Sequence, residues 1–197
     1  MKTRYSFSEK IQNAYYLLLT HIQFRNARLI RRPIYIRGKN SLTLGDNFTI
    51  GRHTRIDLPG DKTTLRIGKN CNFGDYCHIV AYENVSIGNN CLFASKVFVS
   101  DTSHGQYKLK SVSSAPDVPP NNREIVTSPV IISDNVWLGE NVCVLSGVSI
   151  GFGSIIGANS VVTKDIPDKC IAVGSPARVI KKWDDKAEMW VSINREK

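Results

Sequence analysis

The sequence contains no apolar run long enough to cross a lipid bilayer. The longest such run near its start, AYYLLL at residues 14–19, is far shorter than the roughly 20 residues that a spanning helix needs. The start also lacks a signal peptide with a small-residue cleavage site. The five cysteines include no C-x-x-C pair. We therefore expect reduced thiols, a cytoplasmic location and no metal centre, with contact at the inner face of the membrane left open.

Acidic residues are scarce relative to basic ones. The 17 Asp and Glu residues stand against 26 Lys and Arg, which gives a formal charge of +9. This excess favours an anionic partner such as a phosphorylated cofactor, a nucleic acid or a membrane surface. Nucleic-acid binding would need aromatic residues interleaved with basic ones on one face. The basic residues instead gather near the two ends, so we expect no nucleic-acid partner.

A repeat of six residues organises most of the chain. Starting from an aliphatic or aromatic residue, the sequence divides into LGDNFT, IGRHTR, IGKNCN, FGDYCH, IGNNCL, FASKVF and VSDTSH, and later into ISDNVW, LGENVC, VLSGVS, IGFGSI, IGANSV and VTKDIP. The first position is apolar, the second is mostly Gly or small, and the fifth is compact. This period predicts a mainly β protein, a parallel β-helix in which three hexapeptides make one coil and the first residue points inward.

The fifth position also explains three of the cysteines. Cys71, Cys77 and Cys91 occupy it, where a small buried hydrophobic residue is expected. Their spacings of six and fourteen residues match no common zinc pattern. We therefore predict a packing role for these thiols.

The repeat divides the chain into three parts. Residues 1–33 form an N-terminal helical segment, residues 34–173 the β-helix with an inserted loop at 105–129, and residues 174–197 a C-terminal tail. Residues 6–30 read as a helix capped by Ser6 or Ser8, and its apolar positions are Ile11, Tyr15, Leu18 and Ile22. The pattern predicts that Pro33 ends it.

The N-terminal helix has two possible roles. It can pack on the β-helix, or it can rest on an anionic membrane, because Arg25, Arg28, Arg31 and Arg32 follow its apolar positions. A second, short helix is expected from Trp183 to about Asn194, after the turn GSPAR.

The repeat is interrupted at His104. The loop that follows, residues 105–129, has four prolines and many polar residues, and a loop this long in a compact domain is usually functional or disordered. A rigid coil would hold His104 beside it, and an imidazole is a suitable general base near neutral pH. His21, His53 and His78 are weaker candidates because no long loop adjoins them.

The segment from SDTSHG through NVWLGENV to GSPAR resembles the hexapeptide-repeat sugar O-acetyltransferases, especially those that modify bacterial lipopolysaccharide O-antigen. The resemblance covers about residues 42–183. It implies a left-handed β-helix, a homotrimer with clefts between adjacent prisms, and acetyl-CoA as co-substrate. It also implies that His104 deprotonates an acceptor hydroxyl, which then attacks the thioester directly.

The same resemblance assigns further residues. The backbone N–H of Glu140 is the candidate oxyanion donor, and Trp137 is expected to line the site. Coenzyme A is expected to contact Ser146, Gly157, Ala158 and Thr163, with Lys164, Arg178 and Lys181 toward its phosphates. The nearest candidates in the sequence to orient His104 are Asp101 and the Glu140 side chain, with a backbone carbonyl as the alternative.

One departure bears on the acceptor. Family members that act on small galactosides or maltose carry an Asn and an Asp where this sequence has Gly74 and Ala81. We therefore expect Tyr107, Lys108 and Arg123 of the loop to contact a glycan acceptor, in a surface polysaccharide or its precursor.

Three alternatives remain at this stage. The first is an N-acetyltransferase acting on an amino sugar nucleotide, or an acetyltransferase acting on another small molecule. The second is a carbonic anhydrase-like zinc enzyme using His53, His78 and His104, which are 25 and 26 residues apart. The third is a trimeric scaffold without activity.

Overall fold

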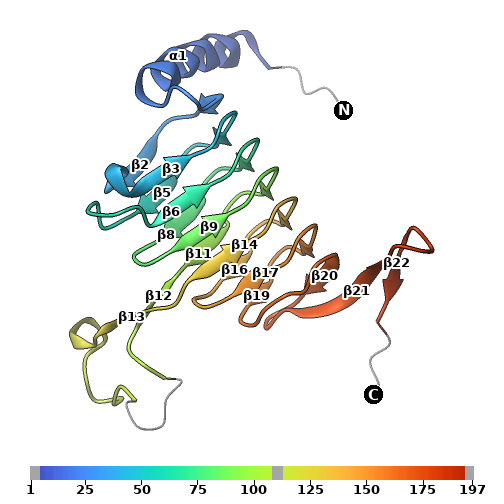
Figure 1. Cartoon of the computed structure of the whole chain (residues 1–197). Helices are drawn as coiled ribbons and strands as arrows, with labels where there is room; N and C mark the ends of the chain where they lie inside the picture. The colour runs from blue at the N-terminus through green and yellow to red at the C-terminus, as the bar shows by residue number, and fades with distance from the viewer. Residues whose placement is uncertain (1–4, 108–112, 194–197) are drawn as a thin grey trace.

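The computed structural model describes residues 5–107 and 113–193. Three sheets with parallel neighbouring strands form the sides of a prism, which confirms the β-helix (Figure 1). Sheet A contains β1 (Leu29–Ile30), β4 (Thr49–Ile50), β7 (Asn72–Phe73), β10 (Leu92–Phe93), β15 (Trp137–Leu138), β18 (Ile155–Ile156) and β20 (Cys170–Val173). Sheet B contains β2 (Ile34–Arg37), β5 (Thr54–Asp57), β8 (His78–Val80), β11 (Phe98–Ser100), β16 (Cys143–Val144) and β19 (Val161–Val162). Sheet C contains β3 (Leu42–Leu44), β6 (Leu65–Ile67), β9 (Val85–Ile87), β14 (Val130–Ile132) and β17 (Ser149–Ile150).

The core follows the repeat. First-position residues such as Ile50, Leu138 and Ile156 point into the prism and are fully buried. Phe73 and Phe93 stack there with ring centroids 4.1 Å apart. The fifth-position thiols Cys71, Cys77 and Cys91 are also buried, which confirms their packing role. Burial raises the pKa of the Cys77 thiol to about 11, so this thiol is unreactive at neutral pH.

The corners of the coils explain the second and fourth positions. A Cβ on Gly45 would lie 2.5 Å from the backbone carbon of Gly68 in the next coil, so no side chain fits there. The fourth position adopts a left-handed conformation, with φ between 57° and 79°, at Asn47, His53, Asn70, Tyr76, Asn90, Lys96, Asn135, Asn141, Gly147, Gly153 and Asn159. Asn tolerates this region better than most residues. The Asn70 amide also donates to Asn90 of the next coil, and Asn90 donates to Asn135.

The N-terminal helix is shorter than expected. Helix α1 spans Phe7–Gln23, with Ser6 as N-cap in a reciprocal capping box with Glu9. The chain then turns into β1, which pairs with β4, so Pro33 does not end the helix. Thr20 anchors the helix to the prism, because its buried hydroxyl accepts the N–H of Ile30. In the part of the chain that the structure covers, no helix combines the length and apolar character needed to span a membrane.

The prediction of a C-terminal helix is wrong. Residues of that segment form an antiparallel hairpin of β21 (Arg178–Asp184) and β22 (Met189–Ser192), which extends sheet A beyond β20. Trp183 and Trp190 pair across it with ring centroids 5.5 Å apart, and the Asp184 carboxylate accepts backbone N–H groups of the turn. The cross-strand aromatic pair and the turn cap therefore favour strands. Asn194 lies outside the described residues.

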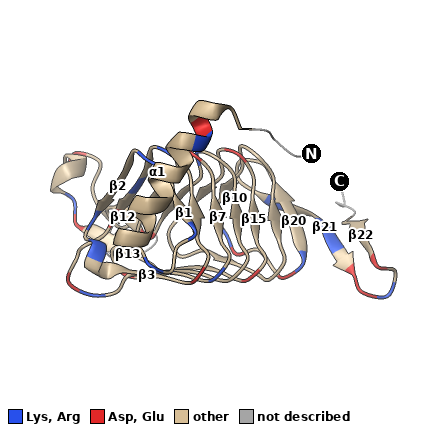
Figure 2. Cartoon of the chain, turned by 90° about the horizontal axis from the view of Figure 1, so that it is seen from above, with Lys and Arg blue, Asp and Glu red and all other residues tan. Residues whose placement is uncertain are grey.

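A two-stranded ribbon leaves the prism between β11 and β14. Its strands are β12 (Thr102–His104) and β13 (Ile125–Thr127), which pair antiparallel. The expected loop at 105–129 is thus shorter, because its end returns as a strand. Short 3-10 turns occur at η1 (Lys39–Ser41) and η2 (Pro120–Asn122). The ribbon projects from one side of the prism, whereas α1 and the β21–β22 hairpin lie at its two ends (Figures 1 and 2). Strand β21 carries three Lys and Arg residues, whereas α1 carries only Lys10 (Figure 2).

The fourth position yields a stability prediction. We expect Asn90→Ala to lower the free energy of unfolding by about 1–2 kcal/mol, because alanine is strained in the left-handed region. Asn90→Gly keeps that conformation at little steric cost and should lose less. Denaturant unfolding of both variants measures the difference. Equal losses would assign the effect to the asparagine ladder instead of the backbone conformation.

Candidate active site

His104 stands where the ribbon leaves the prism. It is the last residue of β12, its backbone pairs with Ile125, and its side chain is exposed. The base of the ribbon is held by Ser128, whose N–H donates to the Asp101 carbonyl. His104 therefore lies on an anchored strand beside sheet B.

Asp101 does not orient His104, contrary to the sequence-based expectation. Its carboxylate is fully buried and accepts the backbone N–H groups of Tyr82, Glu83 and Asn84 at 2.8–3.0 Å. These bonds tie the start of the ribbon to the corner of the preceding coil. A buried carboxylate satisfied by backbone amides is a structural anchor, so the role of Asp101 is to fix the geometry from which His104 projects.

A cavity of about 560 Å³ lies between the ribbon and the outer face of sheet B. His104 and Ile125 line it from the ribbon, and His78, Val80, Phe98 and Leu145 line it from sheet B. Its walls are largely apolar with two imidazoles, a composition typical of small-molecule sites.

His78, which the sequence ranked as a weaker candidate, also lines this cavity. Its Nε2 lies 3.1 Å from Oδ2 of Asp57 in the preceding coil, and its ring packs against Phe98. Burial alone would raise the pKa of Asp57, but hydrogen bonds from Arg55 and His78, together with their charges, lower it. The sequence did contain a signal for this placement: His78 is the sixth residue of FGDYCH. The sixth position faces outward, and His78 lies there in the same row as Phe98.

The loop residues expected to contact the acceptor are engaged within the loop. The Tyr107 hydroxyl donates to the His104 carbonyl at 2.6 Å, and Arg123 donates to that hydroxyl at 2.7 Å. Arg123 also donates to the carbonyls of Val118 and Pro116. Arg123 thus braces the loop behind His104, and its expected contact with the acceptor stays a prediction. Lys108 lies outside the described residues.

Three of the expected coenzyme A contacts lie on the same edge of the prism as His104. Strand register aligns Val99 with Val144 and Val162 in successive coils. The residues that directly follow these three are Ser100 and Asp101, Leu145 and Ser146, and Thr163 and Lys164. Ser146 itself lines the cavity. A row of small and basic residues therefore continues from the cavity along the edge between sheets B and C.

The remaining expected residues lie elsewhere. Trp137 is half-exposed on the outer face of sheet A, in one row with Ile155, Ile171 and Lys181. Residues at the corner between sheets A and B, or beside it, are Glu140, Gly157, Ala158 and Arg178. Sheet B separates this corner from the edge with His104 by about 15 Å, the length of a strand of five residues. The site residues thus fall into two groups on one chain.

The Glu140 side chain is not available to orient His104. Its Oε2 accepts the N–H of Ser95, and its Oε1 lies 3.8 Å from Nζ of Lys96. Both partners belong to the corner of the preceding coil, on the far side of sheet B from His104. That expectation is therefore wrong, whereas the backbone N–H of Glu140 stays a prediction.

The three-histidine zinc alternative is not supported. The His53 ring stacks on Tyr76 with centroids 4.8 Å apart, at a corner away from the cavity that His78 and His104 share. Among the described residues, no group of three or more His, Cys, Asp or Glu side chains is arranged to hold a metal ion.

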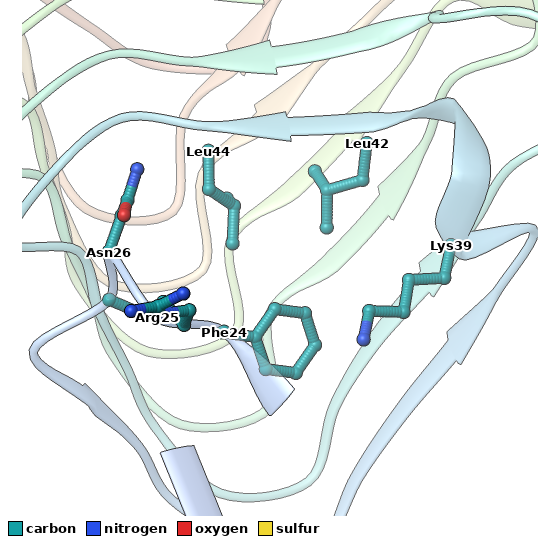
Figure 3. A pocket seen from close by; sticks show the side chains of 7 residues that line it. Phe24, Arg25, Asn26, Lys39, Leu42 and Leu44 are labelled. Carbon is teal, nitrogen blue, oxygen red and sulfur yellow. The ribbon is translucent and has the colours of Figure 1, made fainter. Parts of the chain in front are cut away.

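A second, smaller cavity of about 270 Å³ lies below the end of α1 (Figure 3). Phe24, Leu42 and Leu44 give it an apolar lining, and Nζ of Lys39 lies 4.1 Å from the centre of the Phe24 ring. None of the described site residues lines it, so we assign the site to the cavity beside His104.

Two family models match the repeats. The model of bacterial transferase hexapeptide (six repeats) matches residues 129–164, and that of the hexapeptide repeat of succinyl-transferase matches residues 64–94. Among curated proteins, the chain is 44% identical to WbbJ of Escherichia coli K12, assigned as a lipopolysaccharide biosynthesis O-acetyl transferase, over 88% of each chain. It is 34% identical to the galactoside O-acetyltransferase of the same organism, over 78% of this chain and 73% of that protein.

Solved structures agree on the fold. A galactoside acetyltransferase in complex with coenzyme A matches with a TM-score of 0.56 and 31% identity, over 75% of this chain and 74% of that one. AntD, an N-acyltransferase from Bacillus cereus in complex with dTDP-4-amino-4,6-dideoxyglucose and coenzyme A, matches with a TM-score of 0.69 and 24% identity, over 95% and 94%. The chain therefore belongs to the hexapeptide-repeat acetyltransferases and is an acyltransferase that uses acetyl-CoA.

Proposed function

We propose that the protein transfers the acetyl group of acetyl-CoA to a hydroxyl of a sugar, in a surface polysaccharide such as O-antigen or in its precursor. The observation that carries this proposal is the exposed imidazole of His104 in a 560 Å³ cavity whose opposite wall is a rigid sheet. The relative assigned to lipopolysaccharide biosynthesis, 44% identical over most of both chains, supports a sugar acceptor.

In the proposed mechanism His104 acts as general base. The unprotonated ring nitrogen of His104 takes the proton of the acceptor hydroxyl while the hydroxyl oxygen attacks the thioester carbonyl. The resulting tetrahedral oxyanion is stabilised by a backbone N–H, for which Glu140 is the candidate. The carbon–sulfur bond then breaks, and the coenzyme A sulfur leaves with the proton that His104 returns. A thioester is already activated, so positioning and one base are sufficient.

The base yields a direct prediction. We expect His104→Ala to lower kcat about 100- to 10,000-fold, because a positioned base contributes this much to catalysis. Release of the coenzyme A thiol from acetyl-CoA, against a panel of nucleotide sugars and O-antigen fragments, measures it. His53→Ala is the matched control, since that ring stacks on Tyr76 outside the cavity.

Two outcomes would change the assignment. Undiminished turnover of the His104→Ala variant would refute the mechanism. Turnover with amino sugar nucleotides alone would indicate an N-acetyltransferase instead.

We further propose that a homotrimer completes the site. His104, Ser146, Thr163 and Lys164 lie on one edge of the prism, and Trp137 with the Glu140 corner lies across sheet B from them. Neither group alone surrounds a substrate on both sides. An adjacent copy that presents its sheet A side to the His104 edge would supply the second wall.

Subunit mixing tests this arrangement. We expect His104→Ala and Trp137→Ala to be nearly inactive alone and to regain activity when co-assembled. Random mixing in a trimer leaves about a quarter of the clefts with both residues intact. The thiol-release assay on co-purified hybrids measures the recovery, and sedimentation measures their size. Hybrids that stay as inactive as the parents would contradict a shared cleft.

We propose that α1 contacts an anionic membrane surface. Phe7, Ile11, Tyr15, Leu18 and Ile22 form a stripe along the helix and are 57–79% exposed, opposite the buried Tyr16 and Thr20. Arg25 and Arg28, which follow directly, are exposed as well. An apolar stripe followed by basic residues suits a helix lying in the plane of a negatively charged lipid interface.

Vesicle flotation tests the membrane contact. Replacing Ile11, Leu18 and Ile22 together by Ser should lower binding to vesicles with anionic lipid at least about tenfold, because three apolar side chains lose burial. Ile131→Ser, at a half-exposed isoleucine of sheet C, is the control. A triple variant that changes the sedimentation size and not vesicle binding would assign the stripe to a subunit contact.

A further inference from the structure

A charged cluster lies on the outer face of sheet B, toward the N-terminal end from the His104 cavity. Strand register aligns Tyr35 with Arg55, and Arg37 with Asp57, on neighbouring strands β2 and β5. The next strand, β8, brings His78 into the row of Arg55. We call Tyr35, Arg37, Arg55 and Asp57 the arginine cluster.

The arginine cluster holds more positive than negative charge. Asp57 is its one carboxylate, buried to 8% side-chain exposure, and it accepts two N–H groups of Arg55 at 2.5 and 3.2 Å. Arg37 lies farther from it, with Nε 3.7 Å from Oδ1, and donates to the Tyr35 hydroxyl. Both guanidinium groups lie near the Tyr35 ring, with Cζ 5.3–5.9 Å from its centre.

The exposed part of the cluster can bind an anion. About half of each arginine side chain is accessible, 56% for Arg37 and 51% for Arg55. A guanidinium carries five N–H donors, so the contacts to Asp57 and Tyr35 use only part of this capacity. Two forked cations beside one neutralised carboxylate fit the oxygens of a phosphate or diphosphate.

The cluster is continuous with the catalytic cavity. His78 bonds to Asp57 on one side and lines the cavity on the other. Strand β5 lies two strand spacings from β11, which leads into the ribbon with His104, a distance of about 10 Å. Strand β2, which carries Arg37, lies one spacing farther. A sugar bound in the cavity would therefore have His78 and then the cluster next to it along sheet B.

We propose that the arginine cluster binds the diphosphate of an activated acceptor sugar, linked either to a nucleotide or to an isoprenoid lipid. This inference rests on the proposed sugar acetyltransferase function and narrows its acceptor. The cluster is separate from the residues expected to bind coenzyme A. Of the basic residues expected to meet the coenzyme A phosphates, Lys164 follows β19, at the end of sheet B away from β2 and β5. Arg178 and Lys181 lie on β21 in sheet A.

Calorimetry on protein saturated with coenzyme A tests the proposal, because the coenzyme then occupies its own phosphate site. The probes are UDP and farnesyl diphosphate, each compared with its uncharged partner, uridine or farnesol. We expect at least one diphosphate to bind at least about tenfold more tightly than its partner. The probe that binds identifies the source as nucleotide or isoprenoid lipid.

Variants assign the binding to the cluster. Arg37→Gln together with Arg55→Gln should weaken the diphosphate at least about tenfold and leave coenzyme A affinity unchanged. Arg37→Gln alone, which leaves the Arg55–Asp57 bonds intact, should give a smaller loss of the same kind. Arg66→Gln is the matched control, an exposed arginine at the same level on sheet C that donates to Asn84.

The outcomes separate this inference from the proposed function. Failure of both diphosphates to bind, an equal loss in Arg66→Gln, or a changed sedimentation size in the double variant would overturn the cluster's role. Thiol release with neutral sugars, unaffected by the arginine variants, would overturn it while leaving the acetyltransferase function intact. Failure of coenzyme A itself to bind would instead count against the proposed function.

Discussion

The structure depends on one constraint: each coil must lie a single strand spacing from the next. At this distance backbone amides bond from coil to coil, and little room is left at the corners. The second position therefore has no space for a side chain at Gly45, and the fourth adopts a left-handed conformation in all the hexapeptides except VSDTSH and VTKDIP. The first and fifth positions fill the interior. The sixth position can face outward, and His78 and Trp137 both occupy it.

The same constraint explains why the chemistry gathers at an interruption. A regular coil offers a flat face, whereas a ribbon that leaves the prism encloses a cavity against that face. The ribbon must be anchored to be useful, and the fully buried Asp101 carboxylate supplies the anchor through three backbone amides. Asp101, although it is near His104 in sequence, therefore acts by fixing the backbone from which His104 projects.

Sheet B lies between the two groups of candidate site residues and also carries the arginine cluster. Its outer face carries Arg55, His78 and Phe98 in one row, so charge gives way to an apolar wall as the row reaches the cavity. Its two edges carry the two groups of site residues, with His104 beside one and Glu140 at the other. A prism side is too wide for side chains on its two edges to meet within one chain, and this separation is the basis of the proposed shared cleft.

Much of the architecture could be predicted from the sequence, because the apolar first position of each hexapeptide identifies the residues that point into the prism. Buried Cys71, Cys77 and Cys91 and the interruption at His104 follow from that pattern alone. The C-terminal hairpin could not be read in this way, since Trp183 and Trp190 favour strands only when they meet across a turn. The roles of Asp101, Glu140 and His78 were also decided by tertiary structure. Stacking brings Asp57 to His78 and Ser95 to Glu140 across 21 and 45 residues, and no local pattern encodes such neighbours.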